Sequence, residues 1–224
     1  MSVFVLKVLA ILAMLTDHIA AVFFTDEPKL YLVMRGFGRI AFPIFCFLIV
    51  EGYFHTRNVK KYMARLAVFA IISEIPFDLC FYHKLFYWQH QNVFFTLLLG
   101  LVAIYALEEV KKHFSESYLK MLLLQFAVII LAMTAAWLLC TDYSMLGILI
   151  IMAFYINRGN KIQTTISLMI VTFCLGNEIQ LLSLLALVPI FLYNGKKGPS
   201  MRYVFYVFYP AHLLILYAIS TLIA

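Results

Sequence analysis

Apolar segments separated by short polar breaks run along the whole chain, and this pattern limits its possible folds more than any other feature. The segments lie at 3–24, 31–53, 62–81, 91–108, 118–139, 142–157, 162–176, 178–193 and 203–223. A transmembrane helix needs about 20 consecutive, mainly apolar residues, so each longer segment fits one crossing. Several segments are short and two breaks are barely turns, so we expect about nine transmembrane helices, within a range of roughly 8–10.

The composition excludes a water-soluble alternative. Of the 224 residues, 65% are hydrophobic and 12% are charged, and the mean hydropathy is +0.96. A soluble domain has about 45–50% apolar and about 25% charged residues, so this chain has too few charges for a water-facing surface. A soluble enzyme, a disordered regulator and a nucleic-acid-binding domain are therefore excluded. We expect an all-α, polytopic membrane helix bundle in which residues 1–224 form a single domain.

The first segment and the cysteines fit this interpretation. The segment 3–24 is too long for a signal-peptide core and lacks a convincing cleavage site, so we expect it to remain a membrane helix. The four cysteines each lie in an apolar stretch without metal-ligand spacing, so we expect neither a zinc site nor a disulfide framework. They are Cys46, Cys80, Cys140 and Cys174.

Charge in the breaks predicts the orientation. With a cytoplasmic N-terminus, the outer breaks hold only Lys29 and Lys84. The cytoplasmic breaks then hold Arg57, Lys60, Lys61, Arg65, Lys111, Lys112, Lys120, Arg158, Lys161, Lys196, Lys197 and Arg202. Lysine and arginine concentrate on the cytoplasmic side of membrane proteins. The bias predicts a multi-pass protein of the cytoplasmic membrane, with an external C-terminus and cytoplasmic loops at 54–61 and 194–202.

Ionisable side chains also occur inside the predicted spans, where their cost usually indicates a pathway or a site. In the first span Lys7 and His18 are eleven residues apart, which places them about 20° apart on one helix face and ~16 Å apart along its axis. Asp17 is adjacent to His18. Packing does not require a histidine and an aspartate side by side at this depth, so we favour a functional role for this pair.

Two further pairs follow in the next spans. Arg35 and Arg39 share a helix face at i,i+4, as do Glu74 and Asp78. Pro76 lies between the two carboxylates and is expected to kink or end its helix. Other polar residues are near the ends of spans or, for His212, near the middle of the last one. They are Glu51, His55, Asn92, Thr96, Asp142, Tyr143, Glu178 and His212.

Structural interpretations remain open for most of these residues. Arg35 and Arg39 could face Glu74 and Asp78 in a salt-bridge network without function. His212 could be a buried packing residue.

The same holds nearer the membrane surfaces. Asp142 and Tyr143 could simply end a helix at the interface. The basic stripe, defined as Arg57, Lys61 and Arg65 at i, i+4 and i+8, could bind lipid phosphates instead of a ligand.

Histidine can take or give a proton near neutral pH, and a neighbouring carboxylate can hold its tautomer. Adjacent helix residues diverge by about 100°, so Asp17 could instead pair with Arg35 or Arg39. A membrane-embedded base beside arginines suits deprotonation of an amine or hydroxyl and its attack on an activated carbonyl. The basic stripe and Lys7 would suit the phosphates of a cytoplasmic donor. A proton-coupled transporter could use the same groups.

At these residues the sequence resembles the TraX family, named for the F-pilin acetylase of conjugative plasmids. The first span also fits the spacing of a basic residue and a histidine in the larger type-3 transmembrane acyltransferases, as Lys7 and His18. The segments that carry the TraX resemblance are KVLAILAMLTDHIA (7–20), GRIAFPIFCFLIVEGYFHTRN (38–58), KYMARL (61–66), ISEIPFD (72–78), NVFFTLLLGL (92–101), DYSMLGIL (142–149) and FYVFYPAHLLIL (205–216).

The resemblance implies an acyltransferase that uses cytoplasmic acetyl-CoA or another acyl-CoA and needs no metal. His18 is then the catalytic candidate with Asp17 as its orienter, and Arg35 and Arg39 are oxyanion or thioester contacts. Lys7 and the basic stripe become coenzyme A contacts, and the remaining polar residues form a substrate or structural network. The implied acceptor is a peptide N-terminus, a pilin-like protein, or a glycan or lipid. The alternatives are a proton-coupled transporter or flippase and a non-catalytic assembly factor.

Overall fold

The computed structural model describes residues 1–199 and 202–223, and these residues form helices joined by short loops, without a strand. The elements are α1 (Val3–Phe23), α2 (Pro28–Gly38), α3 (Ala41–His55), α4 (Val59–Tyr82), α5 (Val93–His113), α6 (Tyr118–Leu138), α7 (Ser144–Ile156), α8 (Lys161–Leu175), α9 (Glu178–Leu181), the 3₁₀ helix η1 (Leu182–Ala186), α10 (Leu187–Phe191) and α11 (Arg202–Ile223). The expected all-α fold is confirmed. Residues 200 and 201 of the predicted cytoplasmic loop lie outside the described residues.

Asparagines fix where several helices begin. The side chain of Asn58 accepts the N–H of Lys61 at the start of α4, and Asn92 accepts the N–H of Phe94 at the start of α5. Asn160 caps α8 in the same way. Such a cap satisfies one of the N–H groups that the first helical turn leaves unpaired. These helices therefore start directly after the polar breaks.

The second predicted span, 31–53, crosses as two helices. Helix α2 ends at Gly38, and α3 begins at Ala41 after Arg39 and Ile40. Pro43 lies in the first turn of α3, where its missing N–H removes no helical hydrogen bond. The break places Arg39 at a helix terminus, from which its side chain reaches α1.

The helices differ in how well their length fits a membrane crossing. Among the described residues, five helical stretches are long and apolar enough to span a membrane, and three apolar ones are shorter. The predicted span 178–193 consists of the short elements α9, η1 and α10. Helix α4 does not end at Pro76 but continues to Tyr82.

Helix α1 supplies the central face of the bundle. Leu6, Ala10 and Ala13 lie at helical spacing and are fully buried. Asp17 and Ala20 continue the same buried face, which explains why this carboxylate points into the protein.

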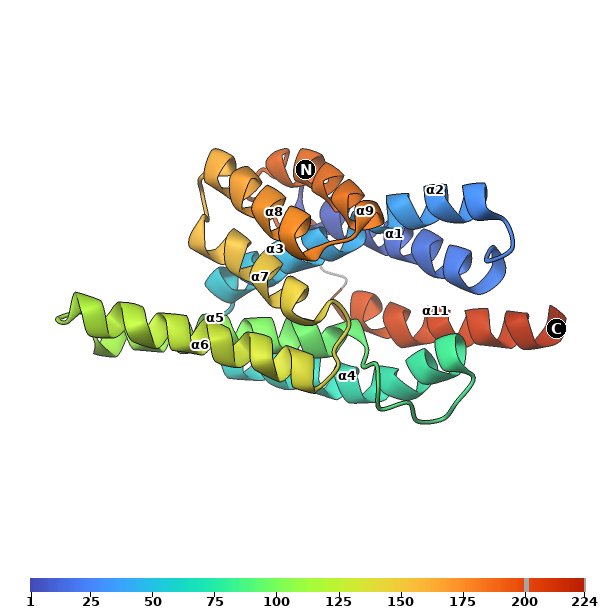
Figure 1. Ribbon diagram of the computed structural model, residues 1–224, viewed down its shortest axis with the longest axis horizontal. Helices are drawn as coiled ribbons and strands as arrows, with labels where there is room; N and C mark the ends of the chain where they lie inside the picture. Colours follow the sequence, from blue (N-terminus) through green and yellow to red (C-terminus); the bar gives the residue numbers. More distant parts are fainter. Residues whose placement is uncertain (200–201, 224) are drawn as a thin grey trace.

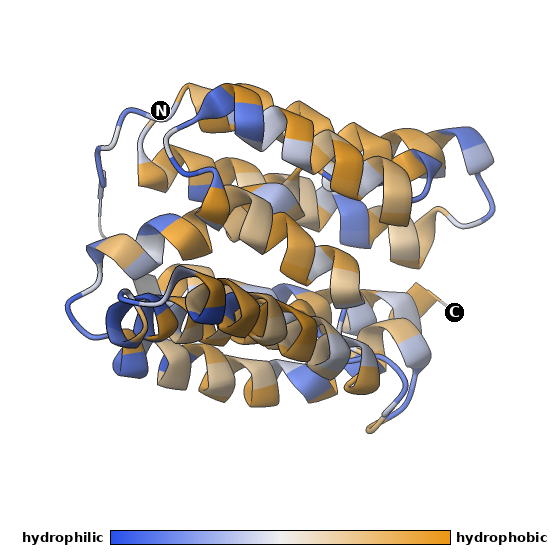
Figure 2. Ribbon diagram, turned by 60° about the vertical axis from the view of Figure 1, so that its left-hand side comes forward, coloured by the Kyte–Doolittle hydropathy of each residue, from blue (hydrophilic) through white to orange (hydrophobic). Residues whose placement is uncertain are grey.

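The helices run mostly along the long axis of the molecule (Figure 1). Helix α1 packs against α2, α3 and α11, and α4 packs against α5 and α11. Figure 2 shows hydrophobic helices between hydrophilic loops, which gather at the two ends of the molecule. This arrangement is typical of a multi-pass membrane protein, because apolar side chains face the lipid and loops reach water.

Candidate functional site

Asp17 forms the centre of an ion-pair cluster between α1 and α2. Arg35 Nη1 donates a hydrogen bond to Asp17 Oδ2, and Arg39 Nη2 donates one to Asp17 Oδ1 at 2.5 Å. Gly38 lets the helices approach, because a Cβ atom at this position would lie 2.3 Å from the Asp17 Cβ. Both carboxylate oxygens of Asp17 therefore bind arginines, as in the alternative in which Asp17 pairs with Arg35 or Arg39. The expectation that Asp17 orients His18 is not met, and His18 is oriented by another contact.

The two arginines do not face the acidic pair of α4, contrary to the salt-bridge interpretation. Helix α2 packs on α1, whereas α4 packs on α5 and α11. Glu74 Oε2 accepts the N–H of Asn92 at 3.2 Å, and Asp78 Oδ2 accepts the N–H of Tyr87 at 2.7 Å. Glu74 and Asp78 thus hold the loop between α4 and α5.

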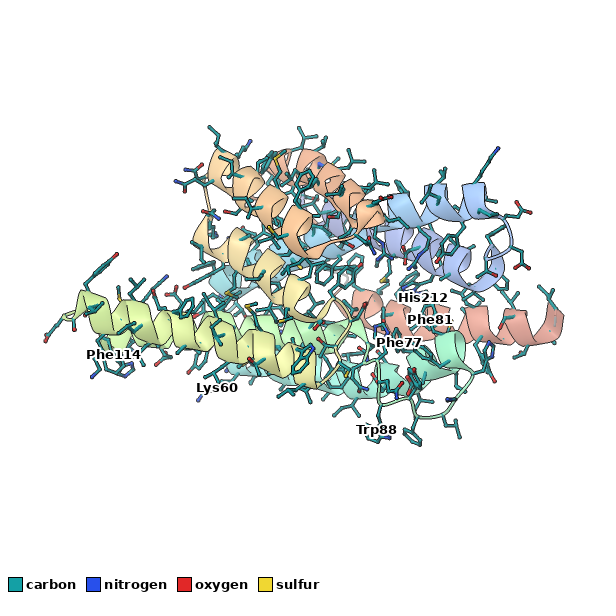
Figure 3. All side chains as sticks on the ribbon, viewed as in Figure 1. Lys60, Phe77, Phe81, Trp88, Phe114 and His212 are labelled. Atoms are coloured by element: carbon teal, nitrogen blue, oxygen red, sulfur yellow. The ribbon has the colours of Figure 1, made fainter. Side chains whose placement is uncertain are left out.

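His18 meets His212 of α11. The two rings are nearly parallel, with centroids 5.0 Å apart and an interplanar angle of 7°. His18 Nδ1 lies 2.7 Å from His212 Nε2. Phe81 of α4 contacts His18 edge-on, with ring centroids 5.2 Å apart. Figure 3 labels His212, Phe81 and Phe77 close together where α11 meets α4.

His18 and the ion-pair cluster line a cavity of about 310 Å³, which we call the outer cavity. The predicted orientation places it toward the external side. Its other walls are mainly aromatic. The lining residues are Met14, Asp17, His18, Ala21, Arg35, Gly38, Arg39, Ala41, Phe42, Phe45, Phe77, Phe81, Tyr82, His90, Val93, Asp142, Tyr143 and Tyr209.

A strained loop between α6 and α7 forms one wall of the outer cavity. Tyr143 and Ser144 have φ angles of 62° and 43°, in a region that non-glycine residues rarely occupy. The hydroxyl of Thr96 donates to the carbonyl of Asp142, and the Tyr143 ring stacks on Phe42 with centroids 3.7 Å apart. Asp142 and Tyr143 thus line the cavity as well as preceding α7. Strain held by surrounding contacts often accompanies a functional site.

His90 is a cavity residue that the sequence interpretation missed. Its Nδ1 lies 2.6 Å from the hydroxyl of Tyr82, and its Nε2 lies 3.5 Å from Asp142 Oδ1. The hydrogen bond with Asp142 raises the pKa of His90 above its ordinary value. The only sequence signal was a histidine just before Asn92, in a predicted loop.

A second cavity, of about 440 Å³, lies toward the predicted cytoplasmic end, and we call it the inner cavity. Lys7, Arg65 and Lys197 line it, together with Glu51 and His55. Arg57 and Lys61 are exposed and are not among its lining residues. The basic stripe therefore divides, since only Arg65 reaches the cavity. Glu178 is exposed at the start of α9.

Glu51 is the buried acid of the inner cavity. Arg158, from the loop before α8, donates from Nε to Glu51 Oε1 at 2.8 Å. His55 Nδ1 lies 3.8 Å from Glu51 Oε2. The Nε–H of Arg65 is buried and has no hydrogen-bond partner in the described part of the chain. The inner cavity thus keeps an unused cationic donor although its carboxylate is paired.

The two cavities adjoin each other. Met14, Phe45, Val93 and Tyr209 line both. These shared side chains form a layer of mainly apolar groups between the two cavities. Lys7 and His18, which share one face of α1, therefore lie on opposite sides of the layer.

Comparison with known proteins finds a family model and one relative that cover nearly the whole chain, and a second relative that covers less of it. The TraX family model, described as "TraX protein", matches residues 2–220. The "Probable fimbrial assembly protein FimC, serogroup H1" of Dichelobacter nodosus is 34% identical over 239 residues, covering 96% of this chain and 94% of that protein. The "Uncharacterized protein RP591" of Rickettsia prowazekii (strain Madrid E) is 29% identical over 157 residues, covering 70% of this chain and 56% of that protein. No solved structure matches.

Proposed function

The chain belongs to the TraX family, and on this premise we propose that it is an acyltransferase. It transfers an acyl group, most simply acetyl, from cytoplasmic acyl-CoA to an amine or hydroxyl of a membrane or exported acceptor. The observation that carries the proposal is the pair of adjoining cavities. One contains a histidine beside two arginines, and the other contains cations at the predicted cytoplasmic end.

The inner cavity suits the donor. Coenzyme A carries several phosphate groups, and arginine and lysine form strong charge-assisted hydrogen bonds with phosphate. Lys7, Arg65 and Lys197 supply these cations, and the unpaired Nε–H of Arg65 is available to an anion. The long thiol arm of coenzyme A is thin and flexible, which suits passage through the layer between the cavities.

The outer cavity suits the chemical step. His18 takes the proton of the acceptor amine or hydroxyl, whose nitrogen or oxygen attacks the thioester carbonyl. The carbon–sulfur bond breaks, and the protonated His18 returns the proton to the leaving sulfur, so that the products are the acylated acceptor and free coenzyme A. Arg39 keeps one buried N–H without a hydrogen-bond partner in the described residues, and this donor suits the negative oxygen of the transition state.

The relatives suggest the acceptor and the location. A TraX-family protein of Dichelobacter nodosus carries the name of a probable fimbrial assembly protein, which supports a pilin-like acceptor with a free N-terminus. An exported pilin would reach the outer cavity of an enzyme in the cytoplasmic membrane from the external side.

Purified protein in liposomes provides the test. We expect release of free coenzyme A from acetyl-CoA to rise when a peptide with a free N-terminus is added, and the peptide to gain an acetyl group by mass spectrometry. Absence of both release and donor binding would contradict the proposal. Proton flux across the liposome membrane without acyl transfer would instead support the transporter alternative, since the same histidines and ion pairs could serve a proton pathway.

A further inference from the structure

The contact between His18 and His212 fixes which ring nitrogens carry hydrogens. His212 Nδ1 lies 2.8 Å from the carbonyl oxygen of Phe208. A carbonyl oxygen only accepts hydrogen bonds, so this nitrogen must carry the hydrogen. In the neutral ring, His212 Nε2 then holds a lone pair and accepts a hydrogen bond.

The direction of the second bond follows from the first. His18 Nδ1 lies 2.7 Å from His212 Nε2 and must therefore be the donor. In the neutral ring of His18, the remaining nitrogen, Nε2, then holds the lone pair. It has no hydrogen-bond partner among the described residues, and His18 lines the outer cavity whereas His212 does not.

The opposite direction would require a positively charged His212. The side chain is buried, with 4% of its surface exposed, and its ring neighbours are Phe208, Tyr209 and His18. No carboxylate of the described residues forms an ion pair with it. An unpaired charge at such a position is costly.

We infer that His212 is a positioning residue, which holds His18 in the tautomer whose Nε2 lone pair faces the reacting groups. This inference rests on the proposed function of His18 as the base. In serine proteases an aspartate holds the catalytic histidine in the required tautomer. Replacing that aspartate by asparagine leaves the geometry intact but strongly lowers kcat, because the histidine takes the wrong tautomer. Here a histidine backed by a carbonyl group would do the same from a helix at the other end of the chain.

The tautomer can be measured without any assay of transfer. In protein labelled with ¹⁵N-histidine and held in detergent micelles, nitrogen chemical shifts distinguish protonated from unprotonated ring nitrogens. We expect His18 to carry its hydrogen on Nδ1, with the signal assigned by its loss in His18→Ala. A hydrogen on Nε2 of His18 in the native protein would overturn the inference even if the protein is an acyltransferase.

Variants of His212 test the consequence. His212→Phe keeps the ring but cannot accept a hydrogen bond, so the His18 tautomers should mix and kcat should fall by roughly 10-fold or more at similar KM. His212→Gln offers an acceptor near the position of Nε2 and should restore part of both the Nδ1–H tautomer and kcat. His113→Phe, at an exposed site on α5, is the matched control and should change neither.

Each outcome separates the inference from the proposed function. A native kcat and an unchanged His18 tautomer in His212→Phe would overturn the inference and return His212 to a packing role. If His212→Phe fails to fold, the native spectrum and His212→Gln still decide, since Gln must retain the Nδ1–H tautomer. If no donor or acceptor reacts with the native protein, the proposed function fails while the tautomer measurement stands.

Discussion

The outer and inner cavities adjoin but differ in how their charged side chains are paired. In the outer cavity Asp17 binds two arginines at once, and the side chains of all three are largely buried. In the inner cavity the carboxylate of Glu51 binds Arg158, whose side chain is 40% exposed, while Lys7, Arg65 and Lys197 add positive charge. The outer cavity is thus held by paired charges, and the inner one carries more positive than negative side chains.

The difference suits two separate roles for the two cavities, one in positioning reacting groups and one in binding a ligand. Fixed hydrogen bonds and a strained loop suit a site that must position reacting atoms within a narrow tolerance. Surplus positive charge near the predicted cytoplasmic surface suits capture of an anionic ligand from water. The following changes would break or sharpen this comparison, in order of decreasing effect.

The assignment of the cavities to opposite sides gives an all-or-none prediction. In a chain whose four native cysteines are replaced by serine, an impermeant maleimide added outside intact cells should label Trp88→Cys but not Asn58→Cys. Trp88 is 80% exposed and lies in the loop between α4 and α5. Labelling of Asn58→Cys from outside would contradict the predicted orientation of the protein in the membrane. As a control, both positions should react after the cells are opened.

Removing His18, the proposed base, should affect only the outer cavity. His18→Ala should lower acyl transfer by ~10²–10⁴-fold because a positioned base contributes that much. Donor binding should remain, since the inner cavity is intact, and an unchanged size-exclusion profile would show that the protein is folded. Near-normal turnover of a folded His18→Ala protein would contradict the role of His18 and move attention to His212.

Neutralising the carboxylate of each cavity should lower the free energy of unfolding by different amounts. Asp17→Asn leaves two largely buried arginines without a counter-charge and should lower the free energy of unfolding by about 3–5 kcal/mol. Glu51→Gln leaves one half-exposed arginine and should cost less than about 1 kcal/mol. Denaturant unfolding in detergent compares the two variants. Equal losses would remove the distinction between the cavities, and Asp17→Asn should lower transfer less than His18→Ala if it still folds.

The basic stripe should divide functionally as it does in space. Arg65→Ala should weaken the apparent affinity for acyl-CoA by roughly 10–100-fold, since a charge-assisted hydrogen bond contributes about 1.5–3 kcal/mol. Arg57→Ala, outside the cavity, is the matched control and should leave donor affinity unchanged. Equal effects of the two variants, or none in either, would return the whole stripe to a role at the lipid surface.

His90 gives the smallest expected effect. Because its pKa is raised in the folded protein, its stabilising contribution is complete below its unfolded pKa of about 6.5 and is lost as the pH rises through the folded value. Both side chains of the His90–Asp142 pair are about a third exposed, so the loss should stay below ~1 kcal/mol. Unfolding measured between about pH 5 and pH 8 should show this loss, and Asp142→Asn should abolish it. An unchanged pH profile in Asp142→Asn would contradict the assignment.

The sequence by itself determined the membrane bundle and its family. Apolar length and the need to satisfy every backbone group inside lipid allow little besides helices, and both depend only on neighbouring residues. Ionisable side chains are costly at membrane depth, and on that ground the sequence also indicated Asp17, His18, Arg35 and Arg39 as candidate site residues. The TraX resemblance rested on motifs along the chain, and the family match confirmed it.

Only the tertiary structure decided which of these groups meet. His18 and His212 are 194 positions apart, and Asp17 pairs with α2 because that helix packs on α1. Helical periodicity predicts which residues share a face, but the rotation of each helix about its axis is set by packing against its neighbours. Arg65, inside α4, reaches the inner cavity, whereas Arg57 lies in the turn before α4 and Lys61 is exposed. His90 joins the outer cavity from a loop, whose path helical periodicity does not predict.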